Sequence, residues 1–298
     1  MTFTIAAAQY PIDRFRAFAD YEYKITRWVN DAAGRGARLI VFPEYGSMEL
    51  ASLAGKNIAA DLKRSIEAMQ DFLPAAYDLH RNLATQQQVY ICAASVPLRQ
   101  SDGSFRNTAR LFSPSGKVGI QEKRVMTRFE REEWHISPGE GLNLFETSLG
   151  KIGIAICYDA EFPLLVRALV EAGAELILVP SCTDAMPGYH RVRVACAARA
   201  LENQCFVVQA PTVGAAEWSP AVDTNAGAAN VFGPPDRHFP DDGVIATGAP
   251  NKPGFVYAKI DLGLVQMVRR DGQVFNHRHW KEQPGAGALP DVTQVKLA

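Results

Sequence analysis

Three side chains with complementary chemistry stand where apolar runs of the sequence end. Cys157 follows IGIAI, Glu44 follows LIVFP and Lys123 follows VGIQE. A thiol can attack an electrophilic carbon, a carboxylate can move the proton of that thiol, and an ammonium can hold a developing negative oxygen. These residue types together predict covalent chemistry centred on a cysteine.

Cys157 stands at a predicted strand-to-helix turn, because the segment from Tyr158 to Pro163 opens a helical pattern. The positive end of a helix dipole lowers the pKa of a nearby thiol, so we expect a reactive thiolate there. The turn also exposes the Tyr158 N–H as an oxyanion donor. The alternative is a buried structural cysteine, which is the commoner case for a cysteine considered alone.

Glu44 and Lys123 each have an alternative role as well. Glu44 directly follows a buried run, where a partly dry cleft would raise its pKa and suit it to act as a general base. A solvated carboxylate at a strand end is the alternative. Lys123 opens an irregular segment, and a lysine considered alone is usually a surface residue.

The elements that must position these side chains occur in the sequence as two similar copies. A strand, a helix and a strand are predicted over residues 4–9, 19–36 and 37–46, and again over residues 151–157, 161–173 and 174–182. Aligning the copies places Glu44 opposite Ser181. Glu44 and Cys157 therefore both lie at carboxyl ends of strands, where ligands of α/β sheets gather. This β–α–β duplication predicts an α/β fold with sheets covered by helices.

The remaining patterns complete a single predicted domain. Further strands are expected over residues 88–100, 107–124, 203–213 and 254–262, and a helix over residues 191–203. We therefore predict one domain over residues 1–280. The tail, residues 281–298, is rich in Gly and Pro and is expected to pack on this domain or on a partner subunit.

Composition narrows the classes of protein. The chain has 298 residues, 47% of them apolar, with 31 Lys and Arg against 32 Asp and Glu, so a basic nucleic-acid binder is not expected. We see no apolar run long enough to span a membrane and no signal peptide at the start. The five scattered cysteines suit a reducing compartment better than a disulfide framework, so we expect a cytoplasmic protein.

The segments FPEYG, EKR and CYDAEFP resemble the signature segments of the nitrilase-like carbon–nitrogen hydrolase superfamily, in the order Glu, Lys, Cys. The likeness extends to GAELILVPS and AARALENQ and covers nearly the whole chain. It is closest to an amidase-type branch whose bacterial members are sometimes fused to an acetyltransferase domain. The resemblance implies a four-layer α-β-β-α sandwich, a homodimer or higher homo-oligomer, and no metal or organic cofactor.

The resemblance also implies site roles. Cys157 would form a thioester, Glu44 would act as base and then acid, and Lys123 with Tyr158 would hold the oxyanion. A second glutamate would position Lys123 and the substrate; the matching position is Glu132, with Glu133 adjacent. In this light Asp159 and Arg128 are structural.

The substrate is the least constrained part of the prediction. Superfamily members that act on N-carbamoyl amino acids often carry an arginine where this chain has Glu161, which favours a neutral or cationic small amide here. The other expected pocket-wall residues are Tyr45, Trp134, Tyr158, Cys182, Thr183 and Asp184. The leading prediction is an amidase acting on a small non-peptide amide. A nitrilase, a ureido amidohydrolase and a non-catalytic binding or scaffold protein on the same fold are the alternatives.

Overall fold

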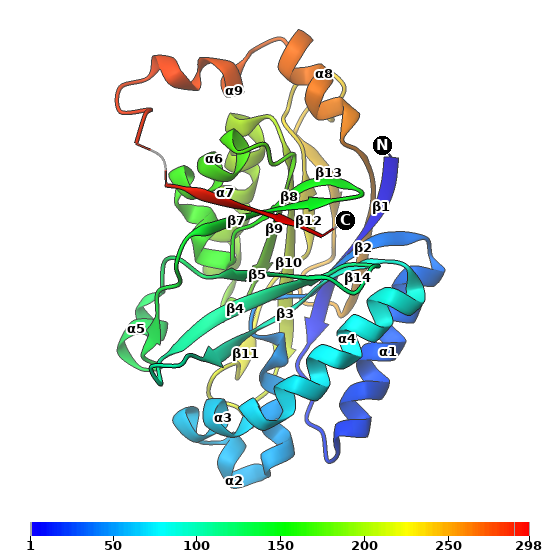
Figure 1. Ribbon diagram of the computed structural model, residues 1–298, viewed down its shortest axis with the longest axis vertical. Coiled ribbons are helices and arrows are strands. Elements are labelled where there is room, and N and C mark those ends of the chain that lie inside the picture. Colours follow the sequence, from blue (N-terminus) through cyan, green and yellow to red (C-terminus); the bar gives the residue numbers. More distant parts are fainter. Residues whose placement is uncertain (1, 289, 298) are drawn as a thin grey trace.

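The computed structural model describes residues 2–288 and 290–297, which form two sheets that meet along one short seam (Figure 1). The first sheet contains, in spatial order, β14 (Gly254–Asp261), β1 (Thr2–Pro11), β2 (Ala37–Val41), β3 (Tyr90–Arg99), β4 (Phe105–Phe112) and β5 (Val118–Glu122). The second contains β15 (Val292–Lys296), β7 (Leu142–Thr147), β8 (Gly150–Ile154), β9 (Leu176–Ser181), β10 (Phe206–Ala215), β12 (Asn230–Phe232) and β13 (Val244–Thr247). Two short strands lie off this path: β6 (Ile136–Ser137) pairs with β4 and β11 (Thr224–Asn225) with β10. The seam is the parallel pairing of Tyr10 with Thr212 and of Pro11 with Val213.

Both predicted strand–helix–strand units are present. In the first, α1 (Phe18–Gly34) connects β1 to β2, and in the second, α6 (Pro163–Glu171) connects β8 to β9; both strand pairs are parallel. Pro163 occupies the first turn of α6, where its missing N–H costs nothing. The mixed α/β class predicted from the duplication is therefore confirmed.

Alternation along the strands sorts the side chains into layers. On β1, Ile5 and Ala7 join a core shared with the second sheet, whereas Ala6 and Ala8 pack with α1. α4 (Leu73–Gln87) also contacts the first sheet, and α7 (Met186–Asn203) contacts the second together with α6 (Figure 1). The order is helices, sheet, sheet, helices, which is the expected α-β-β-α sandwich.

Several elements were not anticipated from the sequence. Between β2 and α4 the chain folds into short helices, which are η1 (Gly46–Ala54), α2 (Lys56–Ala59), α3 (Leu62–Ala68) and η2 (Met69–Phe72). The other short or late helices are α5 (Arg128–Glu132), η3 (Cys157–Glu161), α8 (Gly263–Asp271), α9 (Asn276–His279) and η4 (Trp280–Glu282). Most of these span too few residues to show a helical period.

The tail returns to the body of the chain. In its described part, β15 pairs in parallel with β7, for example Val295 with Phe145. Leu289 and Ala298 of the tail lie outside the described residues. Over residues 2–288 and 290–297, no helix has the length and apolar character needed to cross a membrane.

Candidate active site

The ends of strands from both sheets meet at one cavity. Glu44 follows β2 and Lys123 follows β5 of the first sheet, whereas Cys157 follows β8 and Cys182 follows β9 of the second. All four line a cavity of about 660 Å³. The sequence-predicted wall residues line it as well, namely Tyr45, Trp134, Tyr158, Glu161, Cys182, Thr183 and Asp184. The structure therefore brings the three predicted chemical groups to one place.

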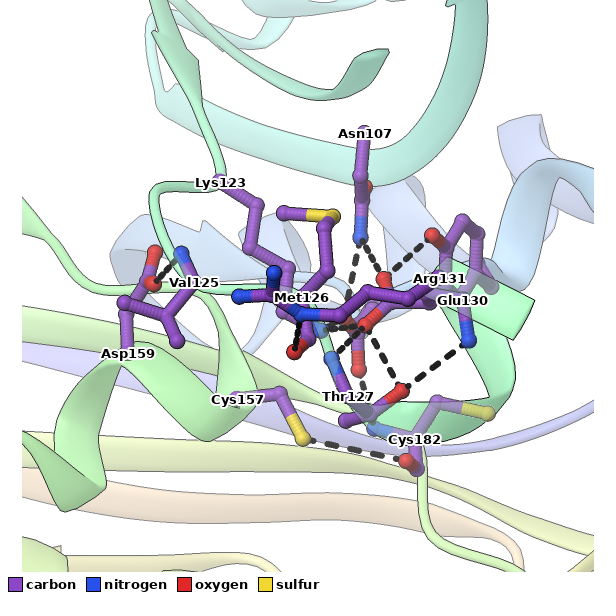
Figure 2. A network of polar contacts seen from close by, with 12 residues as sticks. Asn107, Lys123, Val125, Met126, Thr127, Glu130, Arg131, Cys157, Asp159 and Cys182 are labelled. Carbon is purple, nitrogen blue, oxygen red and sulfur yellow. Dashed lines mark hydrogen bonds and ion pairs between the residues drawn. The ribbon is translucent and has the colours of Figure 1, made fainter. Parts of the chain in front are cut away.

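Lys123 lies between two buried carboxylates. Its Nζ atom is 2.7 Å from Glu44 Oε1 and 2.7 Å from Glu130 Oε2 (Figure 2). Burial alone would lower the pKa of Lys123, but the charges of Glu130 and Glu44 raise it well above its usual value. The lysine is therefore a permanent cation, and one of its three N–H groups remains for a further acceptor.

The glutamate that contacts Lys123 besides Glu44 is Glu130, and not Glu132, the position matched from the sequence. Glu132 is 57% exposed and pairs with Arg128 at 2.8 Å on the surface. Glu130 and Glu132 both lie on α5, where positions two apart point to nearly opposite sides of the helix. Glu130 faces Lys123 and Glu132 faces away. Glu133, the adjacent possibility, is exposed just beyond α5.

The two carboxylates differ in how well their charge is supported. Glu130 accepts hydrogen bonds from Tyr45 Oη at 2.6 Å and from the N–H and Oγ1 of Thr127 at 2.8 and 2.9 Å, besides Lys123. Burial would raise the pKa of Glu130, but Lys123 and these donors hold it below its usual value. Glu44 accepts the Cys182 N–H at 3.0 Å, and burial leaves its pKa raised despite Lys123. Of the two carboxyl groups, Glu44 therefore has the higher pKa.

Asn107 on β4 completes the polar network. Its Nδ2 atom donates to Glu44 Oε1 at 2.9 Å and lies 3.4 Å from Glu130 Oε1 (Figure 2). Asn107 was not singled out in the sequence, because a lone asparagine in a strand carries no recognisable pattern. Glu130 did have a signal: Thr127 and Glu130 form a capping box, with threonine at the N-cap of α5 and glutamate three residues later.

Cys157 has a strained backbone and a protonated thiol. Its φ of 49° lies in the left-handed region, which residues other than glycine seldom adopt outside constrained sites. Its Sγ atom lies 3.7 Å from the Cys182 carbonyl oxygen. Burial raises the pKa of the thiol well above its usual value, and the charge of Glu44 raises it further.

This pKa corrects the expectation of a helix-stabilised thiolate. The turn that begins at Cys157 is η3, a five-residue 3₁₀ helix, and α6 begins only at Pro163. So short a helix contributes little dipole compared with the removal of the thiol from water. Cys157 therefore rests as a thiol, and the negative charge of Glu44 opposes its ionisation.

Asp159 joins the loop that follows Lys123 (the lysine loop) to the turn Cys157–Glu161 (the cysteine turn). Its carboxylate accepts the Arg124 N–H at 3.0 Å and the Val125 N–H at 2.8 Å, directly after Lys123 (Figure 2). Burial nonetheless raises the pKa of Asp159 to about 7. This contact agrees with the structural role expected for Asp159. Arg128 has an 87% exposed side chain but also lines the cavity.

The outer cavity wall carries charges of both signs. Glu161 lies 3.7 Å from Arg191, and burial raises the pKa of Glu161. Asp184, Asp223 and Arg128 also line the cavity. The Glu161 carboxylate, expected to favour a neutral or cationic substrate, is therefore present, and the positive charge of Arg191 partly offsets its negative charge. Within residues 2–288 and 290–297, no cluster of His, Cys, Asp and Glu side chains has a metal-holding arrangement.

Comparison with known proteins agrees with the fold. A structure of the NitFhit protein of C. elegans superposes with a TM-score of 0.74 at 21% identity, covering 95% of this chain and 66% of that one. The probable hydrolase YhcX of Bacillus subtilis is 32% identical over 91% of this chain, and the chain spans about half, 52%, of that protein. An omega-amidase of Danio rerio is 25% identical over 93% of this chain and 94% of its own length.

The family profile described as carbon–nitrogen hydrolase matches residues 4–270. The matched range contains Glu44, Lys123, Glu130 and Cys157, which all line the cavity. The chain therefore belongs to the carbon–nitrogen hydrolase family, as its signature segments predicted.

Proposed function

We propose that this protein hydrolyses the carbon–nitrogen bond of a small non-peptide amide through a thioester on Cys157. One observation carries the proposal: a carboxylate, an ammonium and a thiol, those of Glu44, Lys123 and Cys157, line the same cavity, and Lys123 Nζ lies 2.7 Å from Glu44 Oε1. The similar protein named omega-amidase supports an amide as the substrate class.

In the first half of the reaction, Glu44 takes the proton of the Cys157 thiol as the sulfur attacks the amide carbon. The carbonyl oxygen becomes negative and is held by the remaining N–H of Lys123 and by the backbone N–H of Tyr158. The first N–H groups of a helix lack partners within it, so the N–H of Tyr158 suits this task. Glu44 then returns its proton to nitrogen, the carbon–nitrogen bond breaks, and ammonia or an amine leaves.

In the second half, water replaces the amine. Glu44 takes a proton from the water, whose oxygen attacks the thioester carbon under the same oxyanion donors. The carbon–sulfur bond breaks, the sulfur receives the proton from Glu44, and the acid leaves. Glu44 starts and ends each half as an anion, and a pKa raised towards the working pH suits it to exchange protons in both directions.

The cavity favours a small substrate that is neutral or carries an amine. A volume of about 660 Å³ suits a small molecule. Glu161 and Asp184 line its wall, so a positive group on the substrate would find an acceptor there. Replacing Glu161 by Gln should lower kcat/KM for amine-bearing amides about tenfold and leave neutral ones nearly unchanged, consistent with the loss of one charged hydrogen bond. A preference of the wild type for carboxylate-bearing amides would contradict this substrate class.

The test of the reaction is ammonia release from a panel of small amides, ureido compounds and nitriles, using wild type, Cys157→Ala and Cys182→Ala. Loss of the nucleophile should lower turnover by about four orders of magnitude or more. Cys182 is a matched control, because it lines the same cavity but contributes its backbone N–H and C=O, and Figure 2 shows its sulfur pointing away from Cys157.

The panel also separates the competing functions. Release from amides that persists in Cys182→Ala and vanishes in Cys157→Ala supports the proposal, and an acyl-enzyme mass on Cys157 would identify the thioester. Turnover restricted to nitriles or to ureido compounds would move the function to one of those reactions. Equal activity of Cys157→Ala and wild type would refute cysteine catalysis.

A further inference from the structure

Two residues of different chemistry bridge the same pair of carboxylates. Lys123 Nζ contacts Glu44 Oε1 and Glu130 Oε2, and Asn107 Nδ2 contacts Glu44 Oε1 and Glu130 Oε1. The lysine supplies a positive charge, whereas the asparagine amide supplies two N–H groups without charge. The four side chains form a closed ring in which each carboxylate is held from two sides.

We propose that Asn107 is a positioning residue that holds Glu44 in the orientation and protonation state needed to exchange a proton with Cys157. This inference rests on the proposed function, because it takes Glu44 as the general base. With Asn107 and Lys123 on Oε1, the other oxygen of Glu44 is the one that receives the Cys182 N–H at 3.0 Å. The carbonyl oxygen of Cys182 accepts the Cys157 thiol at 3.7 Å, so Glu44 and the nucleophile both contact the backbone of Cys182.

The orientation of the amide is fixed by charge. Asn107 is fully buried, and turning its amide over would place Oδ1 against two carboxylates. Within the part of the chain that the structure describes, Oδ1 has no hydrogen-bond partner. A buried carbonyl without a partner is costly, and in this orientation the contacts of Nδ2 with the two carboxylates offset that cost.

The side chain can be tested apart from the backbone. The carbonyl oxygen of Asn107 accepts the Lys123 N–H at 2.8 Å, and this bond survives any side-chain replacement. The position of Lys123 is therefore preserved in part when the amide is removed. Removing the amide takes away the N–H donor that stabilises the Glu44 and Glu130 carboxylates.

Loss of the amide should make Glu44 easier to protonate. The ionisable groups that face the Glu44 and Glu130 pair are Tyr45, Lys123, Cys157, Asp159 and Cys182. Lys123 is the cation in this set. When the Asn107 N–H donor is lost, no second cation in the set takes its place beside Glu44. Burial already raises the pKa of Glu44, and removing a donor to its anion raises it further.

The experiment compares Asn107→Leu with Asn230→Leu. Asn230 is a matched control: it is fully buried on β12, and its Nδ2 donates to Tyr189, Gln209 and Ala228, outside the carboxylate ring. Two readouts are taken as functions of pH: kcat/KM for an amide, and the rate of Cys157 alkylation by iodoacetamide, followed by mass spectrometry. Alkylation needs no substrate turnover.

For Asn107→Leu we expect the acid limb of both profiles to move upward by about one pH unit, and kcat/KM to fall about tenfold, as expected when a hydrogen bond to a charged group is lost. For Asn230→Leu we expect a lower Tm with both limbs unmoved. Asn107→Ser, which keeps one donor, should give an intermediate shift and carries the test if the leucine variant does not fold.

Two results would overturn the inference: limbs that coincide with wild type in folded Asn107→Leu or Asn107→Ser, or an equal shift in Asn230→Leu. The failure of the proposed function looks different. In that case wild type releases no product from any amide, while the alkylation profiles still report on Asn107 and the thiol.

Discussion

Among the residues that the structure describes, two buried clusters of lysine, carboxylate and tyrosine have very different surroundings. The cavity cluster consists of Glu44, Lys123, Glu130 and Tyr45. The closed cluster consists of Tyr10, Lys24 and Glu49: Lys24 Nζ lies 2.8 Å from Glu49 Oε2 and the Tyr10 hydroxyl donates to Glu49 Oε1. In both clusters a tyrosine and a lysine hold the same glutamate, but the closed cluster is packed among aromatic rings.

Buried charge alone therefore does not identify an active site. Burial raises the pKa of Glu49 as it raises that of Glu44. The cavity cluster differs in having a thiol beside it and a cavity that a substrate can enter. The closed cluster instead fastens the end of β1 to α1 and η1, and its lysine also bonds the Pro11 carbonyl at 2.6 Å. A perturbed carboxyl group is evidence of function only together with a nucleophile and access.

The largest expected contrast is between the two lysines. Lys123→Met should lower kcat/KM by about 10³-fold, because an oxyanion donor and the partner of Glu44 are lost together. Lys24→Met should leave kcat within about threefold but lower the free energy of unfolding by about 3 kcal/mol, the effect of breaking a buried ion pair. Amide turnover and urea unfolding of both variants measure this. Comparable loss of turnover in both would remove the distinction between the clusters.

The next contrast tests which glutamate belongs to the site. Glu130→Gln should lower kcat/KM about 10²-fold, because Lys123 loses one of its two carboxylate partners. Glu132→Gln removes an exposed ion pair and should change kcat/KM less than about twofold. Steady-state kinetics of the two variants at one pH are sufficient. The reverse order of effects would restore Glu132 as the second glutamate.

A third prediction concerns the tie between the lysine loop and the cysteine turn. Asp159→Asn should lower kcat/KM about tenfold, because its contacts with the loop after Lys123 are altered. Its folded pKa of about 7 lies above the unfolded value, so the stability it gives is complete at low pH and is lost as pH rises towards 7.

Urea unfolding at several pH values checks this sign. From pH 4 to pH 7 the unfolding free energy of wild type should fall by at least about 1 kcal/mol more than that of Asp159→Asn. Parallel curves for the two proteins would show that Asp159 is ionised in the folded state throughout this range.

The smallest expected effect is on the pH profile. The acid limb of kcat/KM should lie above the ordinary glutamate pKa of about 4.3, because burial raises the pKa of Glu44 and activity needs its anion. Glu49→Gln should leave this limb in place within about 0.3 units, since Glu49 belongs to the closed cluster. A limb that follows Glu49 would show that the two clusters are electrically coupled.

Sequence patterns predicted the frame of the molecule and three of the groups at the cavity. The β–α–β duplication was visible because its strands and helices are long and apolar. Glu44, Lys123 and Cys157 were found from their signature segments. The short helices between β2 and α4 were not, because their turns are too few to establish a period.

The remaining site residues depend on orientation in space. FEREE offers three glutamates within one turn of helix, and the Thr127 capping box decides which of them faces inward. Asn107 enters the site through strand register, which places β4 beside β5 and hence beside Lys123. The direction of the Cys157 pKa was predicted wrongly, because a helix start can be read from sequence whereas full burial of the sulfur cannot.

Because the strand pairing between the two sheets is short, a ligand bound in the cavity can also stabilise the fold. The sheets share a hydrophobic core, and backbone pairing joins them at Tyr10 and Pro11. Polar contacts across the site, such as Glu44 with Cys182 and Asp159 with Val125, also join them. A compound bound at the cavity would touch both sheets and so oppose their separation on heating. Ligand at a hundred times its Kd adds about 2.7 kcal/mol to the unfolding free energy. Thermal-shift screening of Cys157→Ala could therefore find the substrate among candidate amides with no turnover at all.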